Sequence, residues 1–138
     1  LAGCYKNFPA KTVHLAVVDP GVGSSRRAIL VETADHFFVA PDNGLLSFAM
    51  RETEKFKVFE ISNEKFFRRP VSRTFHGRDV FAPCAAHLSR GAKAAALAAQ
   101  DAHPLSRARI ARRSLASEPV RRHVVLGGTG RSDATTAL

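Results

Sequence analysis

The stretch TVHLAVVDPGVGSSRR, residues 12–27, decides the fold class. Its opening residues are mostly β-branched or apolar, which predicts a buried strand over residues 12–18. Asp19-Pro20-Gly21 then ends that strand, and a loop rich in glycine and serine follows. In open α/β sheets, ligands gather beyond the carboxyl ends of the strands. Asp19 therefore lies where a catalytic or ligand-binding carboxylate is expected.

Strands and helices alternate in the residues that follow. Further strands are predicted where β-branched and aromatic residues gather, over residues 28–33, 36–40 and 56–61. Helices are predicted over residues 45–50 and 80–89. Asp79 is the expected N-cap of the second helix, Pro83 falls in or near its first turn, and Gly91 terminates it. This alternation predicts an α/β fold, a sheet with flanking helices.

The composition fits one modest domain followed by a basic tail. The 138 residues carry a net charge of +9, and 45% of them are hydrophobic. Residues 1–103 read as the domain, whereas residues 104–138 hold seven Arg, two acidic residues and no periodic pattern. We expect this tail to be disordered coil. A basic arm can bind nucleic acid, but no aromatic residue is interleaved with these arginines, which argues against that function.

Several classes of protein are not favoured by the sequence. No apolar run approaches the roughly 18 residues that cross a membrane, and no signal peptide is visible. Cys4 and Cys84 form neither a CxxC pair nor a disulfide framework, which favours reduced thiols and a cytoplasmic location. No group of His, Cys or carboxylates has metal-ligand spacing, so we expect no metal. The chain opens at Leu1, inside what reads as structured sequence, which indicates a fragment.

Polar residues near the strand ends are the candidates for chemistry. Arg26 and Arg27 can supply fixed positive charge to the loop that holds Asp19. The equally supported alternative is that Asp19 caps the turn while both arginines face solvent. His76 precedes a helix and can hold a polar ligand near neutral pH. A lone histidine is more often an ordinary surface or core residue, and that interpretation is preferred for His87.

Three motifs carry a resemblance to a known family. They are DPGVGSSRR (19–27), APDNGLLS (40–47), and TFHGRDVFAP (74–83) followed by AAHL (85–88). On its own, the second motif is better interpreted as a structural turn. In this order and spacing, the three resemble the S-adenosyl-L-methionine (SAM) hydrolase family. Its members are also called SAM hydroxide adenosyltransferases and are related to the fluorinase and chlorinase. The resemblance covers about residues 5–92 and implies an incomplete N-terminal α/β domain.

The resemblance also implies a reaction and a site. Water would attack the 5′ carbon of SAM, giving adenosine and L-methionine without a cofactor. Asp19, Arg26 and His76 match the residues that hold the nucleophilic water. Gly77 matches a position beside the halide pocket of the halide-using relatives and, with Asp19, is an expected substrate contact. Because all three water-holding residues are present, the resemblance favours water over a halide.

The family protein implied by this resemblance is larger than the present chain. It carries a C-terminal β-barrel that has no counterpart here, and it assembles as a homotrimer with SAM as its small-molecule partner. Residues from about 104 onward do not match the family. Two alternatives stay open: a SAM-dependent halide adenosyltransferase of the same superfamily, and a non-catalytic remnant or basic binding module.

Overall fold

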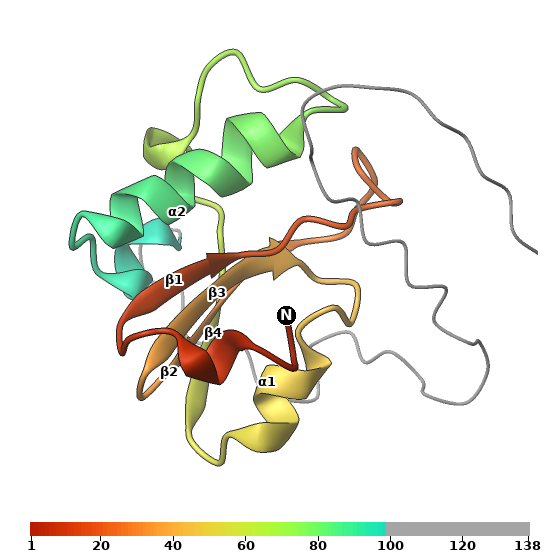
Figure 1. The fold of residues 1–138 in the computed structure, drawn as a ribbon. Helices are drawn as coiled ribbons and strands as arrows, with labels where there is room; N and C mark the ends of the chain where they lie inside the picture. The colour runs from red at the N-terminus through yellow and green to blue at the C-terminus, as the bar shows by residue number, and fades with distance from the viewer. Residues whose placement is uncertain (99–138) are drawn as a thin grey trace, which may run out of the picture.

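A four-stranded mixed sheet forms the centre of the computed structural model, which describes residues 1–98 (Figure 1). Its strands are β1 (Thr12–Leu15), β2 (Ala28–Thr33), β3 (His36–Pro41) and β4 (Phe56–Glu60). Their order across the sheet is β1-β3-β2-β4, with β1 parallel to β3 and the other neighbours antiparallel. The α/β fold class is thereby confirmed. The last residues of the predicted domain, 99–103, and the predicted tail, 104–138, lie outside the described residues.

The β2–β3 hairpin fixes the register of the sheet. Leu30 pairs with Val39, and Ile29 with Ala40. At the turn, the Thr33 hydroxyl donates to the His36 carbonyl and accepts from the His36 N–H, both at 2.9 Å. The predicted strands at 28–33, 36–40 and 56–61 agree with β2, β3 and β4 to within one residue at each end.

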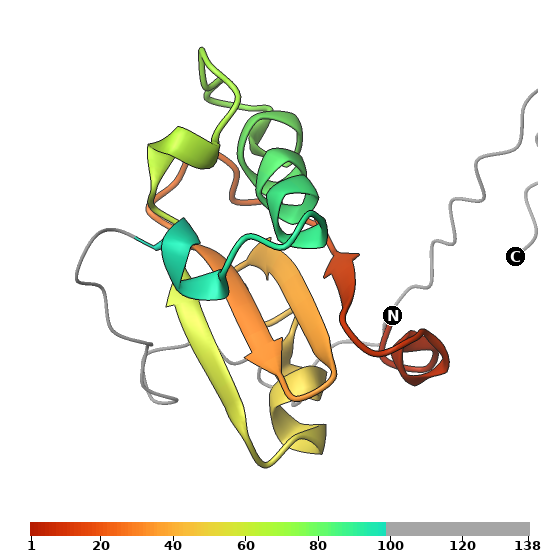
Figure 2. The same ribbon diagram turned by 90° about the vertical axis from the view of Figure 1, so that its left-hand side faces the viewer.

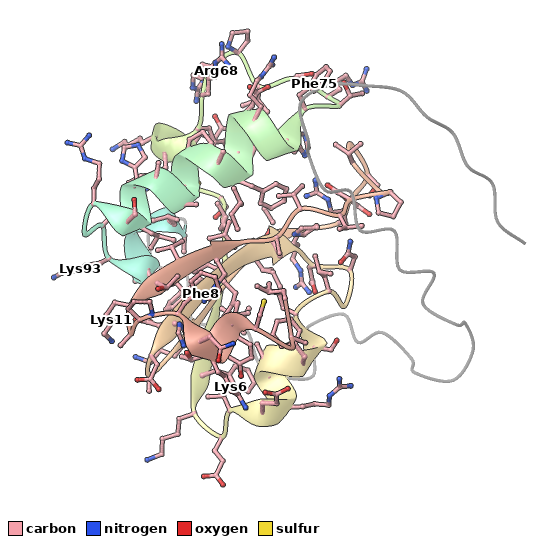
Figure 3. The ribbon with its side chains drawn as sticks, in the orientation of Figure 1. Lys6, Phe8, Lys11, Arg68, Phe75 and Lys93 are labelled. Atoms are coloured by element: carbon pink, nitrogen blue, oxygen red, sulfur yellow. The ribbon has the colours of Figure 1, made fainter. Side chains whose placement is uncertain are left out.

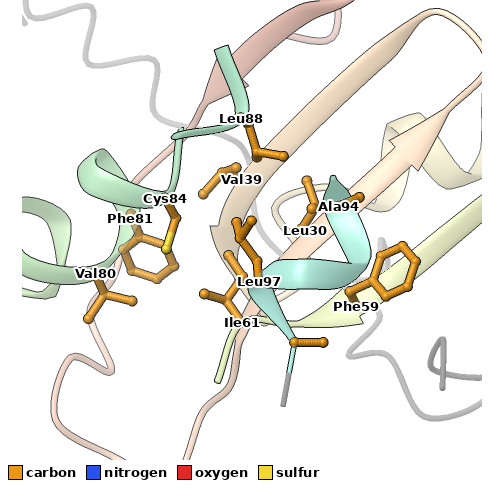
Figure 4. Close-up of a cluster of buried hydrophobic side chains, with 11 residues drawn as sticks. Leu30, Val39, Phe59, Ile61, Val80, Phe81, Cys84, Leu88, Ala94 and Leu97 are labelled. Atoms are coloured by element: carbon orange, nitrogen blue, oxygen red, sulfur yellow. The ribbon is translucent and has the colours of Figure 1, made fainter. Parts of the chain in front are cut away.

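Each face of the sheet is covered by helical segments, because side chains alternate between the two faces of a strand. One face packs against α2 (Ala82–Ser89) and the 3-10 turn η4 (Ala94–Leu97). The opposite face packs against α1 (Ser47–Glu52) and the 3-10 turn η1 (Tyr5–Asn7). Figure 2 shows α2 and α1 separated by the sheet. Figure 4 shows the first cluster, where Leu30 and Val39 of the sheet lie near Cys84 and Leu88 of α2.

The first strand is shorter and more exposed than its sequence predicts. The prediction of a buried strand over residues 12–18 was wrong in its second half, because β1 ends at Leu15 and Val18 is 65% exposed. β1 lies at an edge of the described sheet, with β3 as its paired neighbour. Some of the apolar residues at this edge are therefore not buried by neighbouring elements. The Ala16 N–H still donates to the Val39 carbonyl at 2.9 Å, which carries the chain straight toward Asp19.

The second helix begins earlier than predicted, and Asp79 is not its N-cap. A π-helical turn, η3 (Gly77–Phe81), precedes α2 without a break. The Asp79 carboxylate instead turns back to the preceding loop and accepts the Ser72 N–H at 2.9 Å. Pro83 in the first turn of α2 and Gly91 just beyond its end, with φ +93°, are as predicted. None of the helices within residues 1–98 is long and apolar enough to span a membrane.

Candidate active site

The loop after β1 brings Asp19 and Arg26 together. Arg26 Nε donates to Asp19 Oδ1 at 2.9 Å, and Arg26 Nη2 lies against Asp19 Oδ2. The two side chains are 6% and 11% exposed, for Asp19 and Arg26 respectively. The alternative in which Arg26 faces solvent is therefore wrong. A buried ion pair of this kind fixes the relative orientation of its two side chains, because guanidinium and carboxylate are both planar.

A glycine makes this loop possible. Gly23 has φ +77°, a conformation that residues with a side chain rarely adopt. A Cβ at this position would lie 2.8 Å from the Arg73 carbonyl oxygen, so the loop also approaches the segment before η3 too closely for a side chain. The Ser24 hydroxyl closes the turn by donating to the Gly21 carbonyl at 2.6 Å. The loop is thereby fixed against the segment that carries His76.

His76 joins the pair through Arg26. Arg26 Nη2 lies 2.9 Å from His76 Nδ1, although the two residues are 50 positions apart in the chain. A guanidinium has only donors, so we assign Nδ1 as the acceptor and place the imidazole proton on Nε2. The structure thus gathers the three residues predicted to hold water, with Arg26 between the other two. Among the described residues the Nε2–H of His76 has no hydrogen-bond acceptor, so it can donate to another molecule.

One oxygen of the cluster lacks a hydrogen bond. Asp19 Oδ2 is buried in ion-pair contact with Arg26 Nη2, and no hydrogen bond to it is formed within the described residues. Most buried polar atoms in proteins are hydrogen-bonded, so each exception needs an explanation. A small donor such as water would satisfy this oxygen.

Gly77 lies at the margin of this cluster. It opens η3 directly after His76, and the nearest atom to a Cβ placed there is Val17 Cγ1 at 3.6 Å. Val17 is 39% exposed and precedes Asp19 by two residues. Gly77 therefore faces the segment between β1 and Asp19. Its role as a substrate contact stays a prediction.

The neighbouring Arg27 does not join the cluster. It pairs with Asp42, whose Oδ2 accepts from Arg27 Nε at 3.0 Å and from Nη2 at 2.5 Å. Asn43 in the same turn donates from its side chain to the Val18 carbonyl at 2.7 Å, immediately before Asp19. The segment interpreted from sequence as a structural turn therefore also braces the site. In the sequence, only the match of APDNGLLS to the family motif pointed to a role beyond a turn.

A phenylalanine of the buried core also contacts the cluster. Arg26 Cζ lies 5.1 Å from the centre of the Phe81 ring, which is fully buried. Phe81 also belongs to the apolar cluster between α2 and the sheet (Figure 4). A phenylalanine in a helical pattern reads as core, so no signal in the sequence pointed to this contact.

Three other ionisable groups outside the cluster make contacts that belong to the fold. Hydrogen bonds from Arg78 and from the Ser72 N–H lower the pKa of Asp79 to about 2. Burial raises the pKa of the Cys84 thiol to about 12, so this cysteine is unreactive. His87 packs its ring against Phe66, with centroids 5.1 Å apart, in line with its interpretation as an ordinary residue. Within residues 1–98, no group of three or more His, Cys, Asp and Glu side chains could hold a metal ion.

A cavity of about 460 Å³ lies away from this cluster, and its lining includes Tyr5, Phe8 and His36. Behind it, His14 Nε2 lies 3.3 Å from His36 Nδ1, and both rings are buried. Burial, with the neighbouring imidazole of His36, lowers the pKa of His14. None of the predicted site residues lines this cavity. Figure 3 labels Phe8, which lines this cavity, and Phe75, which lies at the far end of the described structure on the loop before η3.

Comparison with known proteins identifies relatives of the described part of the chain. The chain is 50% identical over 93 residues to an (R)-S-adenosyl-L-methionine hydrolase from Salinispora tropica, covering 67% of this chain and 35% of that protein. It is 42% identical over 82 residues to one from Methanocaldococcus jannaschii, covering 59% of this chain and 30% of that protein. A fluorinase from an Actinoplanes species is 26% identical over 107 residues, covering 61% of this chain and 36% of that protein.

A solved structure supports the same relationship. An uncharacterized conserved protein from Thermotoga maritima superposes with a TM-score of 0.67 at 45% identity, covering 73% of this chain and 38% of that one. The chain therefore spans between about a third and two fifths of the length of these relatives. Residues 1–98 match the family described as the SAM hydroxide adenosyltransferase N-terminal domain. The chain belongs to this SAM hydroxide adenosyltransferase family.

Proposed function

We propose that this chain carries the water-activating site of an enzyme that hydrolyses SAM to adenosine and L-methionine. The relatives named as SAM hydrolases, at 42–50% identity, support this substrate and reaction. The observation that carries the proposal is the Asp19–Arg26–His76 cluster, in which the buried Asp19 Oδ2 has an ion-pair contact with Arg26 but no hydrogen bond within the described residues.

The chemistry of the substrate determines what the site must supply. The sulfonium of SAM leaves as the neutral thioether of methionine, taking the electron pair of the C5′–S bond, so no acid has to protonate it. Water is a poor nucleophile, so the site must align it with that bond and accept its proton as the new C5′–O bond forms. The proposed reaction uses no cofactor and no metal.

Each member of the cluster has a distinct role in this proposal. Asp19 Oδ2 accepts a hydrogen bond from the attacking water and takes its proton. Arg26 fixes the carboxylate through Oδ1 and holds His76 through Nδ1. The Nε2–H of His76 donates to the water oxygen, leaving a lone pair free to attack C5′. Gly77, beside Val17, leaves space for the substrate at the strand end.

A halide adenosyltransferase is the second candidate. The fluorinase relatives favour it, although their identity to this chain is 23–26%, well below that of the SAM hydrolases. A halide ion is an acceptor of hydrogen bonds and has no proton to give to Asp19, so the free carboxylate oxygen favours water. Product analysis in chloride separates the two, because the halide reaction yields a chlorinated adenosine.

The assembly and location belong to the same proposal. The family resemblance favours a homotrimer, and the free thiols favour the cytoplasm. Light scattering during size-exclusion chromatography measures the mass of the assembly directly. A mass of three chains supports the trimer, and a monomer contradicts it for this chain.

Incubation of the chain with SAM tests the function, with adenosine quantified by chromatography against an Asp19→Ala control. Adenosine from the parent and not from the variant supports hydrolysis at this site. Equal adenosine from both would place the activity elsewhere. No adenosine from either would make this chain a non-catalytic remnant, since it spans only about a third of the SAM hydrolases named above.

A further inference from the structure

The Arg26 guanidinium has a third neighbour besides Asp19 and His76. Its Cζ lies 5.1 Å from the centre of the Phe81 ring. Phe81 is fully buried and Arg26 is 11% exposed, so water has little access to this contact. A cation near an aromatic ring is attracted to the electron-rich face, and the attraction grows when both groups are desolvated.

The π-helical turn accounts for how one short segment reaches Arg26 twice. In η3 the Ala82 N–H donates to the Gly77 carbonyl, five residues back. An α-helix aligns residues three and four apart, whereas this wider turn brings residues five apart onto one side. His76 and Phe81 are five residues apart, and both contact Arg26. Such single π turns often occur at functional sites.

A second arginine–phenylalanine pair provides an internal comparison. Arg78 Cζ also lies 5.1 Å from the centre of its ring, that of Phe75. Here the ring is 59% exposed and the Arg78 side chain is 52% exposed (Figure 3). At equal distance, the buried pair has the stronger attraction because water does not screen it. The Phe75 pair is therefore the solvent-exposed counterpart of the buried Phe81 pair.

We propose that Phe81 is a positioning residue of the site, whose ring holds the Arg26 guanidinium in the one orientation that contacts Asp19 and His76 together. This inference rests on the proposed function for its catalytic meaning. The guanidinium contacts Asp19 through Nε and Nη2, and His76 through Nη2. A rotation of its plane breaks both contacts at once. The free oxygen of Asp19 and the Nε2–H of His76 then lose their shared alignment on the water.

Stepwise fluorination of the Phe81 ring tests this in the full chain. Fluorine draws electron density from the ring face while nearly keeping its shape, so mono-, di- and trifluorophenylalanine weaken the cation–π contact in order. We expect hydrogen exchange at Arg26 Nε–H to rise with each fluorine, reaching about fivefold for the trifluoro ring. The His76 ring-nitrogen NMR shifts should move in the same order toward those of mixed tautomers. Should the trifluoro ring not fit this buried position, Phe81→Leu removes the aromatic face instead.

The same fluorination at Phe75 is the matched control, and it should leave the Arg26 and His76 signals unchanged. Arg26 exchange that stays flat across the Phe81 series, or that responds equally to both positions, would overturn the proposal. Both readouts are taken on the substrate-free chain, so they decide the positioning role even if the chain makes no adenosine. Where adenosine is formed, its kcat should fall in the same order with KM unchanged.

Discussion

Two adjacent arginines, Arg26 and Arg27, each pair with an aspartate whose side chain is buried, yet the hydrogen bonds to the two carboxylates differ. Asp42 Oδ2 accepts two hydrogen bonds from Arg27, and the Asp42 N–H donates to the Arg27 carbonyl at 2.9 Å. Asp19 contacts Arg26 through both oxygens, with a hydrogen bond to Oδ1 and an ion-pair contact at Oδ2 that leaves Oδ2 able to accept a hydrogen bond, while Arg26 also contacts His76. The same residue types therefore close a loop in one case and leave an acceptor for a ligand in the other.

Replacing each aspartate by asparagine should give the largest difference between the pairs. Asp19→Asn keeps the shape but cannot take a proton, so we expect adenosine formation to fall by about 100-fold or more. Asp42→Asn keeps the Asp42 N–H bond to Arg27 and should retain most of the activity. Initial rates of adenosine formation for the two variants measure this. Equal losses in both would remove the distinction between the pairs.

Removing the structural carboxylate altogether should cost folding stability. Asp42→Ala leaves the Arg27 guanidinium, which is 24% exposed, without its ion-pair partner. We expect a loss of about 3 kcal/mol in the free energy of unfolding, measured by urea denaturation. Glu64→Ala is the control, because its pair with Arg69 is 65–68% exposed and should contribute less than about 1 kcal/mol. A similar loss in both variants would show that burial of the Arg27–Asp42 pair has no special importance.

The loop between Asp19 and Arg26 should tolerate a methyl group poorly at Gly23. Gly23→Ala forces a side chain into φ +77° and against the Arg73 carbonyl, so we expect about 2 kcal/mol of destabilisation. Gly3→Ala is the matched control, since nothing lies within 4 Å of a Cβ there. Thermal unfolding of the two variants compares them. An unchanged melting temperature for Gly23→Ala would mean that the loop is not fixed against the His76 segment.

A third carboxylate, that of Asp79, predicts a smaller, acid-dependent effect. Its pKa of about 2 is below the ordinary value because Arg78 and the Ser72 N–H stabilise the ionised form. As the pH falls below about 4, the unfolded chain takes up this proton first, so stability is lost between about pH 4 and pH 2. Asp79→Asn should flatten that part of the stability profile. A variant with an unchanged slope would assign the acid sensitivity to other groups.

The sequence predicted the strands well where burial and hydrogen bonding agree. β2 and β3 are apolar and paired, and their bounds follow from β-branched and aromatic residues. β1 was overextended, because an apolar run does not reveal that a strand lies at the edge of a sheet. Asp79 was misplaced as a cap because its partner, the Ser72 N–H, belongs to an irregular loop without periodicity.

The candidate site was predicted through motifs rather than through local pattern. Asp19, Arg26 and His76 came from the family resemblance, since spacing alone left the solvent-facing alternative open. Which of the two arginines pairs with Asp19 depends on the path of the loop around Gly23, a tertiary property. The contact of Phe81 with Arg26 depends on the π turn, which no residue pattern indicates.

The central claim is that Oδ2 of Asp19 directs a water molecule to the 5′ carbon of SAM. Incubation with SAM in ¹⁸O-labelled water containing chloride, followed by mass spectrometry of the nucleoside, tests it most directly. The account predicts adenosine that carries ¹⁸O at the 5′ position, and its loss in Asp19→Asn. Chlorinated adenosine, or adenosine without the label, would contradict it.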